Sequence, residues 1–339
     1  MACDNTTPDP GLADACISIA HGALPQWWLS PAITLNGVSA GATANPPPAV
    51  NVANVTFHRA GADCTLPAGT SGVVVSVYAC VPGLAMNPAD ASKVKQLGST
   101  AFIPLAQAAA GADTSLSGTG HAINWTAGTD PNAPDGPGHK CLVAVACPDS
   151  ESPDPVCFHQ AGGPGAADPH YAQLNIAIEP VPMHPRRPWQ FGTFTINPDR
   201  AAAAPATLRV EADVNPAQAV IDVLTPALNA TPGYRRVARQ APAGFALQLP
   251  QFPTAVIRDR TKWGCLGLLF WILSLLGIRF NVNPSYEADV RLDPGQIATI
   301  NFTADLSRSI PGDAHIFHLT HVRSDGRVIG GLTVAAVAQ

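Results

Sequence analysis

The stretch VNVANVTFH, residues 50–58, alternates between two sets of side chains. In an extended strand, successive side chains point to opposite faces, so the two sets lie on opposite sides of the chain. One face carries Asn51, Ala53, Val55 and Phe57. The opposite face carries Val50, Val52, Asn54, Thr56 and His58. The alternation is imperfect, because apolar residues occur in both sets, but it predicts a β-strand.

Similar short runs surround this stretch on both sides. They are AITLNG (32–37), GVVVSVYACV (72–81), GSTAFIPLA (98–106), GHAINWTAG (120–128), HKCLVAVACP (139–148) and YAQLNIAIEPV (171–181). The breaks between them are rich in Pro, Gly, Asn and Asp, which favour turns. Seven short strands over about 150 residues is the number expected for an immunoglobulin-like sandwich.

The second half of the chain repeats this pattern after a proline-rich stretch. PVPMHPRRPW (180–189) is expected to be a short stiff linker. Beyond it, further strand-like runs alternate with turns, and AQAVIDVLTPAL (217–228) is expected to be a short helix. The sequence therefore predicts an all-β protein of two tandem immunoglobulin-like β-sandwiches. The expected division is a lead-in (1–30), a first sandwich (31–182) and a second sandwich (183–339) with an apolar helical insertion (262–280).

Composition excludes some partners and leaves the location open. Apolar residues make up 46% of the chain, charged residues 13%, and the net charge is −5. Without a block of basic residues, no nucleic-acid surface is expected. The lead-in lacks the basic region of a secretory signal peptide. We therefore expect a cytoplasmic protein, or one exported by a signal-independent route as part of an extracellular assembly. The excess of Arg over Lys, with abundant Ala, indicates a bacterial coding bias.

The cysteines allow several disulfide pairings. The chain has eight cysteines and no C-x-x-C pair, so structural zinc is not expected. Cys147 and Cys157 bracket a loop and could meet across it. Cys3 with Cys16, and Cys64 with Cys80, are other candidate pairs. Buried reduced thiols are an equally good interpretation.

The first module resembles the CARDB-like domains, which are immunoglobulin-type modules of bacterial surface and secreted proteins. The resemblance covers residues 27–181 approximately and rests on WWLSPAI (27–33), NVANVTFHRAGA (51–62), VVVSVY (73–78), INW (123–125), GHKCLVAVACPD (138–149) and DPHYAQLNIAI (168–178). It implies a β-sandwich used for adhesion or as a spacer, without catalytic residues. The second module looks only generically immunoglobulin-like.

Motifs for catalysis or metal binding are weak. GVSAG (37–41) places Ser39 in a G-x-S-x-G pattern, but the following ATANPPP cannot begin the helix that such a nucleophile requires. In HIFHLTH (315–321), a strand would point His318 away from His315 and His321, so these histidines cannot converge on a metal. They are expected to be partly buried and partly at the surface. The acidic loop 149–154 matches no calcium motif. We expect no enzyme, cofactor, metal or small-molecule substrate.

The segment KWGCLGLLFWILSLLGIRF (262–280) differs from the rest of the chain. Its uncharged part, 265–278, would span about 21 Å as a helix, which is shorter than the roughly 30 Å core of a membrane. A single span would also separate strands that are expected to pair. Three interpretations remain: burial against residues 217–228, contact with a partner or a second copy, and insertion into a lipid interface from one side. The expected contact residues are Leu266, Leu268, Leu269, Phe270, Trp271, Ile272, Leu275 and Leu276.

These observations favour a non-enzymatic structural or adhesive protein. It would act as a spacer, an assembly subunit or a surface-binding module, through contacts with a protein partner or by self-association. Aromatic and aliphatic anchors are what protein interfaces rest on, and the segment is rich in both. The alternative is a membrane-active protein that inserts residues 265–278 into a lipid interface.

Overall fold

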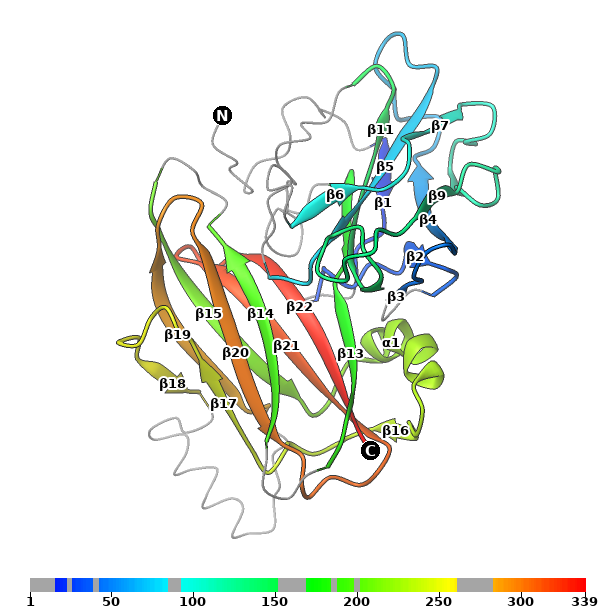
Figure 1. Ribbon diagram of the computed structural model, residues 1–339. Coiled ribbons are helices and arrows are strands. Elements are labelled where there is room, and N and C mark those ends of the chain that lie inside the picture. Colours follow the sequence, from blue (N-terminus) through cyan, green and yellow to red (C-terminus); the bar gives the residue numbers. More distant parts are fainter. Residues whose placement is uncertain are drawn as a thin grey trace.

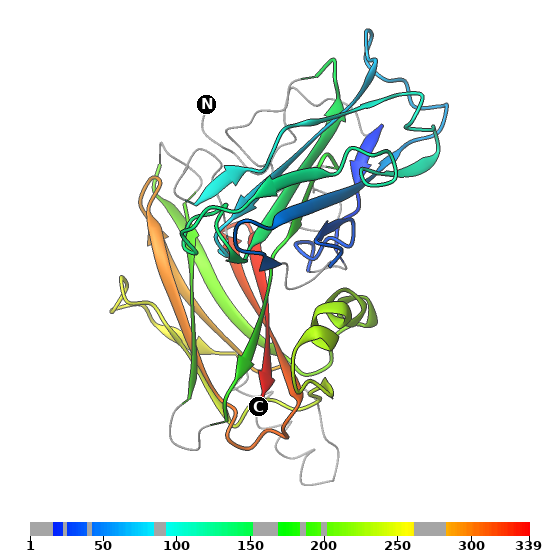
Figure 2. The ribbon, with the colours of Figure 1, turned by 45° about the vertical axis from the view of Figure 1, so that its right-hand side comes forward.

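The described part of the chain forms two β-sandwiches and one helix (Figures 1 and 2). The computed structural model describes residues 16–22, 26–38, 43–84, 93–151, 169–183, 188–197, 202–260 and 283–339. The all-β class expected from the alternating runs is confirmed.

Strand β4 (Val50–Arg59) is the centre of the first sheet of the first sandwich. It pairs antiparallel with four shorter strands, namely β1 (Ile17–Ile19), β2 (Ile33–Leu35), β8 (Ala112–Ser115) and β9 (Ile123–Thr126). The side chains of Asn51, Ala53, Val55 and Phe57 are all buried. The alternation in the sequence therefore fixes which face of β4 lies in the core, because a shift of one residue would expose all four.

The second sheet of this sandwich has β5 (Gly72–Cys80) and β11 (Cys141–Pro148) at its centre. The flanking strands are β12 (Tyr171–Leu174) on β11, with β6 (Val94–Gln96) and β7 (Ala101–Pro104) on β5. A separate short pair joins β3 (Thr43–Ala44) and β10 (Gly138–His139). The first sheet thus runs in the order β1, β4, β2, with β8 and β9 also on β4, and the second runs in the order β12, β11, β5, β6, with β7 also on β5. This is the immunoglobulin-like arrangement of two packed sheets.

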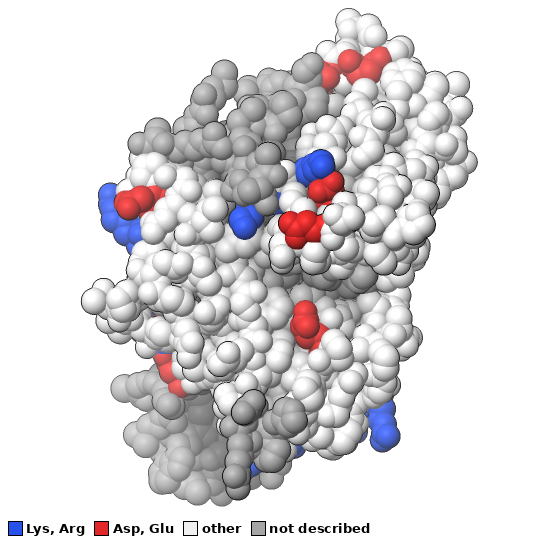
Figure 3. All heavy atoms as spheres, viewed as in Figure 1, with Lys and Arg blue, Asp and Glu red and all other residues white. Residues whose placement is uncertain are grey.

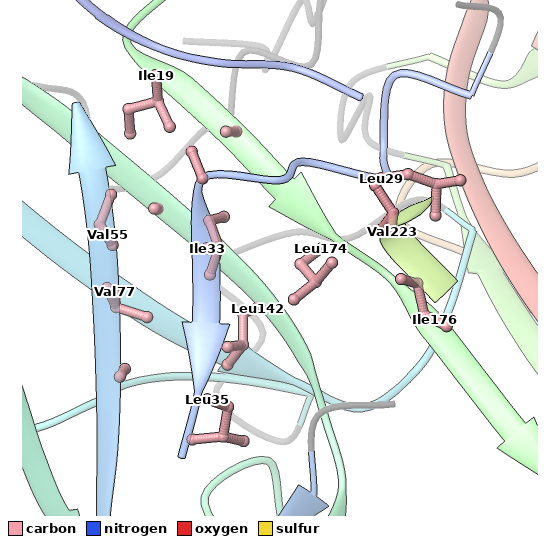
Figure 4. Close-up of a cluster of buried hydrophobic side chains, with 14 of the residues drawn as sticks. Ile19, Leu29, Ile33, Leu35, Val55, Val77, Leu142, Leu174, Ile176 and Val223 are labelled. Carbon is pink, nitrogen blue, oxygen red and sulfur yellow. The ribbon is translucent and has the colours of Figure 1, made fainter. Parts of the chain in front are cut away.

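Side chains from both sheets interdigitate in one core (Figure 4). Ile33 and Val55 come from the first sheet, and Val77, Leu142 and Leu174 come from the second. All five are at most 1% exposed. Burial of apolar area on this scale is the main stabilising contribution to a sandwich.

The second sandwich packs a large sheet on a small one. The large sheet runs in the order β13 (Ile176–Val181), β22 (Val328–Ala338), β21 (Asp313–Arg323), β15 (Ala204–Asp213), β19 (Ser285–Leu292) and β18 (Ile257–Asp259), with β16 (Arg236–Val237) also on β21. The small sheet runs β14 (Trp189–Ile196), β20 (Ile297–Asp305) and β17 (Gly244–Gln248). Phe302 and Phe317, both 0% exposed, meet between the sheets with ring centroids 5.0 Å apart. The strand order differs from that of the first sandwich.

The expected helix is α1 (Gln218–Ala230). Its buried residues are Val220, Val223, Leu224, Ala227 and Leu228. They belong to the same core cluster as Ile176 of β13, Ile316 of β21 and Val337 of β22. The helix therefore covers the outer face of the large sheet at the β13 side (Figure 1).

Residues 171–181 form two strands and not the single strand expected from the sequence. Residues 171–174 pair with β11, whereas residues 176–181 pair parallel with β22 of the second sandwich. Asn175 lies between them and is fully buried. Its side-chain amide donates to the carbonyl oxygens of Gly83 and Gly331, both at 2.6 Å. Asn175 is thus the single buried residue at which the chain leaves one sandwich and enters the other.

Trp28 packs directly across this junction. It lies in the stretch expected to be a polar lead-in, yet it is only 1% exposed. Its indole nitrogen donates to Thr333 Oγ1 of β22 at 2.9 Å. A Cβ added at Gly331 would lie 2.3 Å from two atoms of the Trp28 ring. Gly331 therefore lets the indole ring lie flat against β22.

One disulfide differs from the expected pairings. Cys16 is bonded to Cys64, with a Cα–Cα separation of 5.6 Å, so the pairs Cys3–Cys16 and Cys64–Cys80 are wrong. Strand β1 begins directly after Cys16 and pairs with the end of β4. This pairing places Cys16 beside the loop that follows β4, where Cys64 lies. Cys147 is buried on β11. Cys157 lies outside the described residues, so the pair Cys147–Cys157 stays a prediction.

The substitution Gly331→Ala should destabilise the protein by about 1–3 kcal/mol, because the new methyl group overlaps the Trp28 ring. The free energy of unfolding from urea titration measures this. Gly244→Ala is the matched control, since a Cβ there meets nothing within 4 Å. Equal effects of the two substitutions would contradict the close packing at the junction.

Candidate functional site

The contact residues expected from the sequence lie outside the described part of the chain. They are Leu266, Leu268, Leu269, Phe270, Trp271, Ile272, Leu275 and Leu276, all within residues 261–282. Their role as a contact stays a prediction. Ser39 also lies outside the described residues. The structure does describe the residues from which the apolar segment leaves and to which it returns.

The described residues on either side of the apolar segment lie side by side. Strands β18 and β19 pair antiparallel, with Asp259 opposite Tyr286. Beyond them, the backbone N–H of Arg260 donates to the carbonyl oxygen of Ser285 at 2.9 Å. The described chain therefore stops before the segment and resumes after it at the same edge of the sheet.

The returning end is fixed by Asn283. Its side-chain amide donates to Glu211 Oε1 at 2.7 Å and to Asp213 Oδ1 at 3.3 Å. Its side-chain oxygen accepts from the backbone N–H of Val214 at 3.0 Å. These bonds hold Asn283 against the end of β15.

A cluster of charged side chains surrounds the same strands. Glu287 of β19 has a side chain that is only 4% exposed. It accepts from Arg260 Nη1 at 2.7 Å and from Arg209 Nε at 3.2 Å, and Arg258 Nη2 lies 3.8 Å away. A buried carboxylate is stable only with such partners. The arginines thus hold β15, β18 and β19 together beside the apolar segment.

Asp289 extends this cluster along β19. It accepts a hydrogen bond from Thr207 at 2.6 Å and pairs with Arg258. These two interactions, that of Thr207 first, lower the pKa of Asp289 below its usual range. The sequence analysis did not predict this cluster. Residues 287, 289 and 291 are all charged, and a spacing of two places them on one face of a strand, so the sequence did carry a signal.

Apolar side chains are exposed next to these charges. Val256 is 72% exposed and Ile257 is 40% exposed. Val256 borders a pocket of about 410 Å³, whose other lining residues are Phe252, Thr254, Ala255, Arg258, Asp289, Val290 and Arg291. Among the described strands, β18 is the last one of its sheet. We call Val256, Ile257, Arg258, Asp289 and Arg291 the β18 edge. Exposed aliphatic side chains at the edge of a sheet offer a surface for contact with another chain.

The surface around it carries few charges. On the face shown in Figure 3, Lys, Arg, Asp and Glu are few and scattered among uncharged residues. No helix within the described ranges is long and apolar enough to span a membrane.

The three histidines of β21 are all buried, so the expectation that some lie at the surface is wrong. Each bonds to a hydroxyl group: His315 to Ser309 at 2.8 Å, His321 to Thr195 at 2.8 Å, and His318 to Thr333 at 2.9 Å. Across the described residues, no three His, Cys, Asp or Glu side chains gather as metal ligands.

His318 also contacts a carboxylate, which gives an arrangement of hydroxyl, imidazole and carboxylate. Its Nε2 lies 3.2 Å from Asp213 Oδ2. Burial alone would raise the pKa of Asp213, but the hydrogen bond and charge of His318, with bonds from Asn215 and Asn283, lower it. Thr333 is 0% exposed and also accepts from Trp28. A buried hydroxyl beneath a tryptophan cannot reach a substrate, so this arrangement connects the two sandwiches.

Comparison with known proteins adds little. No family model and no curated protein matches the chain. Among solved structures, the chain is similar to the collagen adhesin (CNA) from S. aureus, with 9% identity and a TM-score of 0.20. That match covers 90% of this chain and 91% of the adhesin chain. A TM-score of this size carries no argument, so the fold assignment rests on the strand order described above.

The buried histidines predict a loss of stability in mild acid. Burial lowers the pKa of His321 to about 4, whereas an unfolded histidine has a pKa of about 6.5. Between these values the unfolded chain binds a proton that the folded chain excludes. Stability should therefore be complete above pH 6.5 and fall toward pH 4, by about 3 kcal/mol in total. Burial also lowers the pKa of His315, which adds to the loss.

Urea unfolding at pH 7 and pH 5 measures this dependence, with His321→Gln as the comparison. The lowered pKa values of Asp213 and Asp289 act only below about pH 4 and do not contribute in this range. The difference between the two pH values should shrink in the variant. An unchanged difference would show that His321 is not the buried group responsible.

Proposed function

We propose that this is a non-enzymatic structural or adhesive protein that acts through protein–protein contacts, as a spacer, assembly subunit or surface-binding module. The observation that carries the proposal is the position of the described residues on either side of the apolar segment. Arg260 and Ser285 meet beside β18, where Val256 and Ile257 are exposed. Exposed aliphatic side chains at the edge of a sheet are suited to contact another protein.

The position of α1 favours contact of the apolar segment with another protein over its burial against α1. The buried side of α1 packs on the core at β13, β21 and β22. Strand β18 is at the opposite edge of the same sheet. Strands are about 4.8 Å apart, so roughly 20 Å of sheet separates the two sites. Figures 1 and 2 show α1 and β18 on opposite sides of the second sandwich. The apolar face of this helix, against which one interpretation placed the segment, already packs on the sheet.

The resemblance of residues 27–181 to CARDB-like modules is part of this proposal. The order of strands in the first sandwich suits a spacer module of that kind. Its function would then be to hold the second sandwich, and the β18 edge with it, at a fixed position relative to whatever the first sandwich is attached to. The rigid junction at Asn175 and Trp28 suits this function, since a hinge there would let the two sandwiches turn relative to each other.

Self-association is the first test of the proposed contact. The double substitution Phe270→Asp and Trp271→Asp places two charges in the apolar segment, which should disrupt an interface that buries it. Native mass measurement should find an assembly for the wild-type chain and a smaller species for the variant. Val50→Asp is the matched control, because Val50 is apolar, 59% exposed and on the first sandwich. It should leave the assembly unchanged.

The membrane-active alternative is tested with the same variants. Co-sedimentation with liposomes of anionic and of neutral lipid should fail for the wild-type chain if proteins are the natural contact. Lipid binding that Phe270→Asp and Trp271→Asp abolish, and Val50→Asp retains, would replace the adhesive proposal by the membrane one. A monomer that binds no lipid and protects residues 265–278 from hydrogen exchange would overturn both, because the segment would then be buried within its own chain.

A further inference from the structure

Two buried thiols lie opposite each other on neighbouring strands of the second sheet of the first sandwich. Cys80 ends β5, and Cys141 begins β11 directly opposite it in the antiparallel register. Side chains that are directly opposite on neighbouring strands point to the same face of the sheet. Both cysteines are 0% exposed and both are reduced in the structure. They belong to one apolar cluster with Val94 and Val143.

The register places these two residues at a separation that a disulfide accepts. Opposite residues in an antiparallel pair have Cα atoms about 4.5 or 5.5 Å apart. Disulfides join Cα atoms that are about 4.4–6.8 Å apart. The register therefore brings the two residues within the range that a disulfide joins. Cys147 on the same strand is opposite Val74 in the register and not opposite a cysteine.

We propose that Cys80 and Cys141 are an oxidation site, which closes to a cross-strand disulfide when the chain folds in the presence of a small-molecule disulfide such as oxidised glutathione. The thiolate of one cysteine attacks the glutathione disulfide and releases one glutathione thiolate. The second cysteine then attacks the mixed disulfide at the protein sulfur and releases the other. Two cysteine thiols are oxidised, one glutathione disulfide is reduced to two thiols, and the two protons pass to the released thiolates.

Burial decides when this reaction occurs. Loss of solvent raises the pKa of both the Cys80 and Cys141 thiols, the former also through the neighbouring Cys141. The attacking species is the thiolate, so the folded sheet supplies almost none, and an oxidant cannot reach the sulfur atoms. The exchange belongs to the folding chain, before β5 and β11 are covered. A chain that folds reduced should remain reduced.

The bond would complete a pattern already present in the first sandwich. The Cys16–Cys64 disulfide links the start of β1 to the loop after β4, and so joins two paired strands of the first sheet. The second bond would join the two central strands of the other sheet. Each sheet of the first sandwich would then have its own covalent link, which is independent of the function proposed for the β18 edge.

The test is to refold the reduced, denatured full-length chain in glutathione buffers. Oxidised glutathione is increased until the Cys16–Cys64 bond is complete, which proves that the oxidant is effective. Free thiols are then alkylated in denaturant, and the peptides are mapped without reduction. Cleavage after Tyr78 separates Cys80 from Cys64, and cleavage after Lys140 releases the peptide with Cys141. The expected product links Cys80 to Cys141.

Three variants make the result specific. In Cys80→Ser, the thiol of Cys141 should become available for alkylation, and the reverse should hold in Cys141→Ser. Cys147→Ser should leave the linkage unchanged. The melting temperature of the oxidised wild-type chain should exceed that of Cys80→Ser with Cys141→Ser by about 5 °C or more. If both cysteines are alkylated once Cys16–Cys64 has formed, or if either is joined to a different cysteine, the proposal is overturned.

Discussion

The arrangement of this protein depends on one buried amide. Asn175 sits where the chain leaves the first sandwich and enters the second, and its side chain donates to carbonyl oxygens of both. A buried amide without partners would be costly, so these two bonds require Gly83 and Gly331 to stay where they are. Trp28 then covers the same junction and bonds to Thr333. The connection between sandwiches is therefore a continuous core, whereas a flexible linker would leave each with its own separate core.

Because the two sandwiches share buried contacts, the sequence predicted individual strands better than the point at which the chain passes from one sandwich to the other. Period-two alternation in residues 50–58 and the apolar face of residues 217–228 are local signals, and both elements formed as expected. The division of residues 171–181 at Asn175 has no local signal, since both halves suit a strand. The pairing of Cys16 with Cys64 was equally hidden, because spacing alone cannot select one pairing among several. In each case the deciding contact joins residues that are distant in the chain.

The candidate site shows the same limit. The apolar character of residues 265–278 is plain in the sequence, and so are Lys262 and Arg279 beside it. What the sequence could not give is the place where the segment is attached. Glu287 pairs with Arg209 of β15 and with Arg260, which directly follows β18. These charged residues are distant in the sequence and form a cluster only because β15, β18 and β19 lie side by side. In a chain with 13% charged residues, such a concentration at one sheet edge is distinctive.

The charges at this edge also favour a protein contact over a lipid one. Exposed edge strands invite unwanted pairing, and charged side chains on the edge restrict which partners can approach. The arginines here are largely committed to Glu287 and Asp289, so they offer little free positive charge to anionic lipid headgroups. Paired charges around an apolar centre are instead what a protein interface uses at its rim, where they select the partner without adding much affinity. In the proposed contact, a partner would cover the apolar segment while Glu287 and Asp289 keep the arginine partners that their own chain supplies.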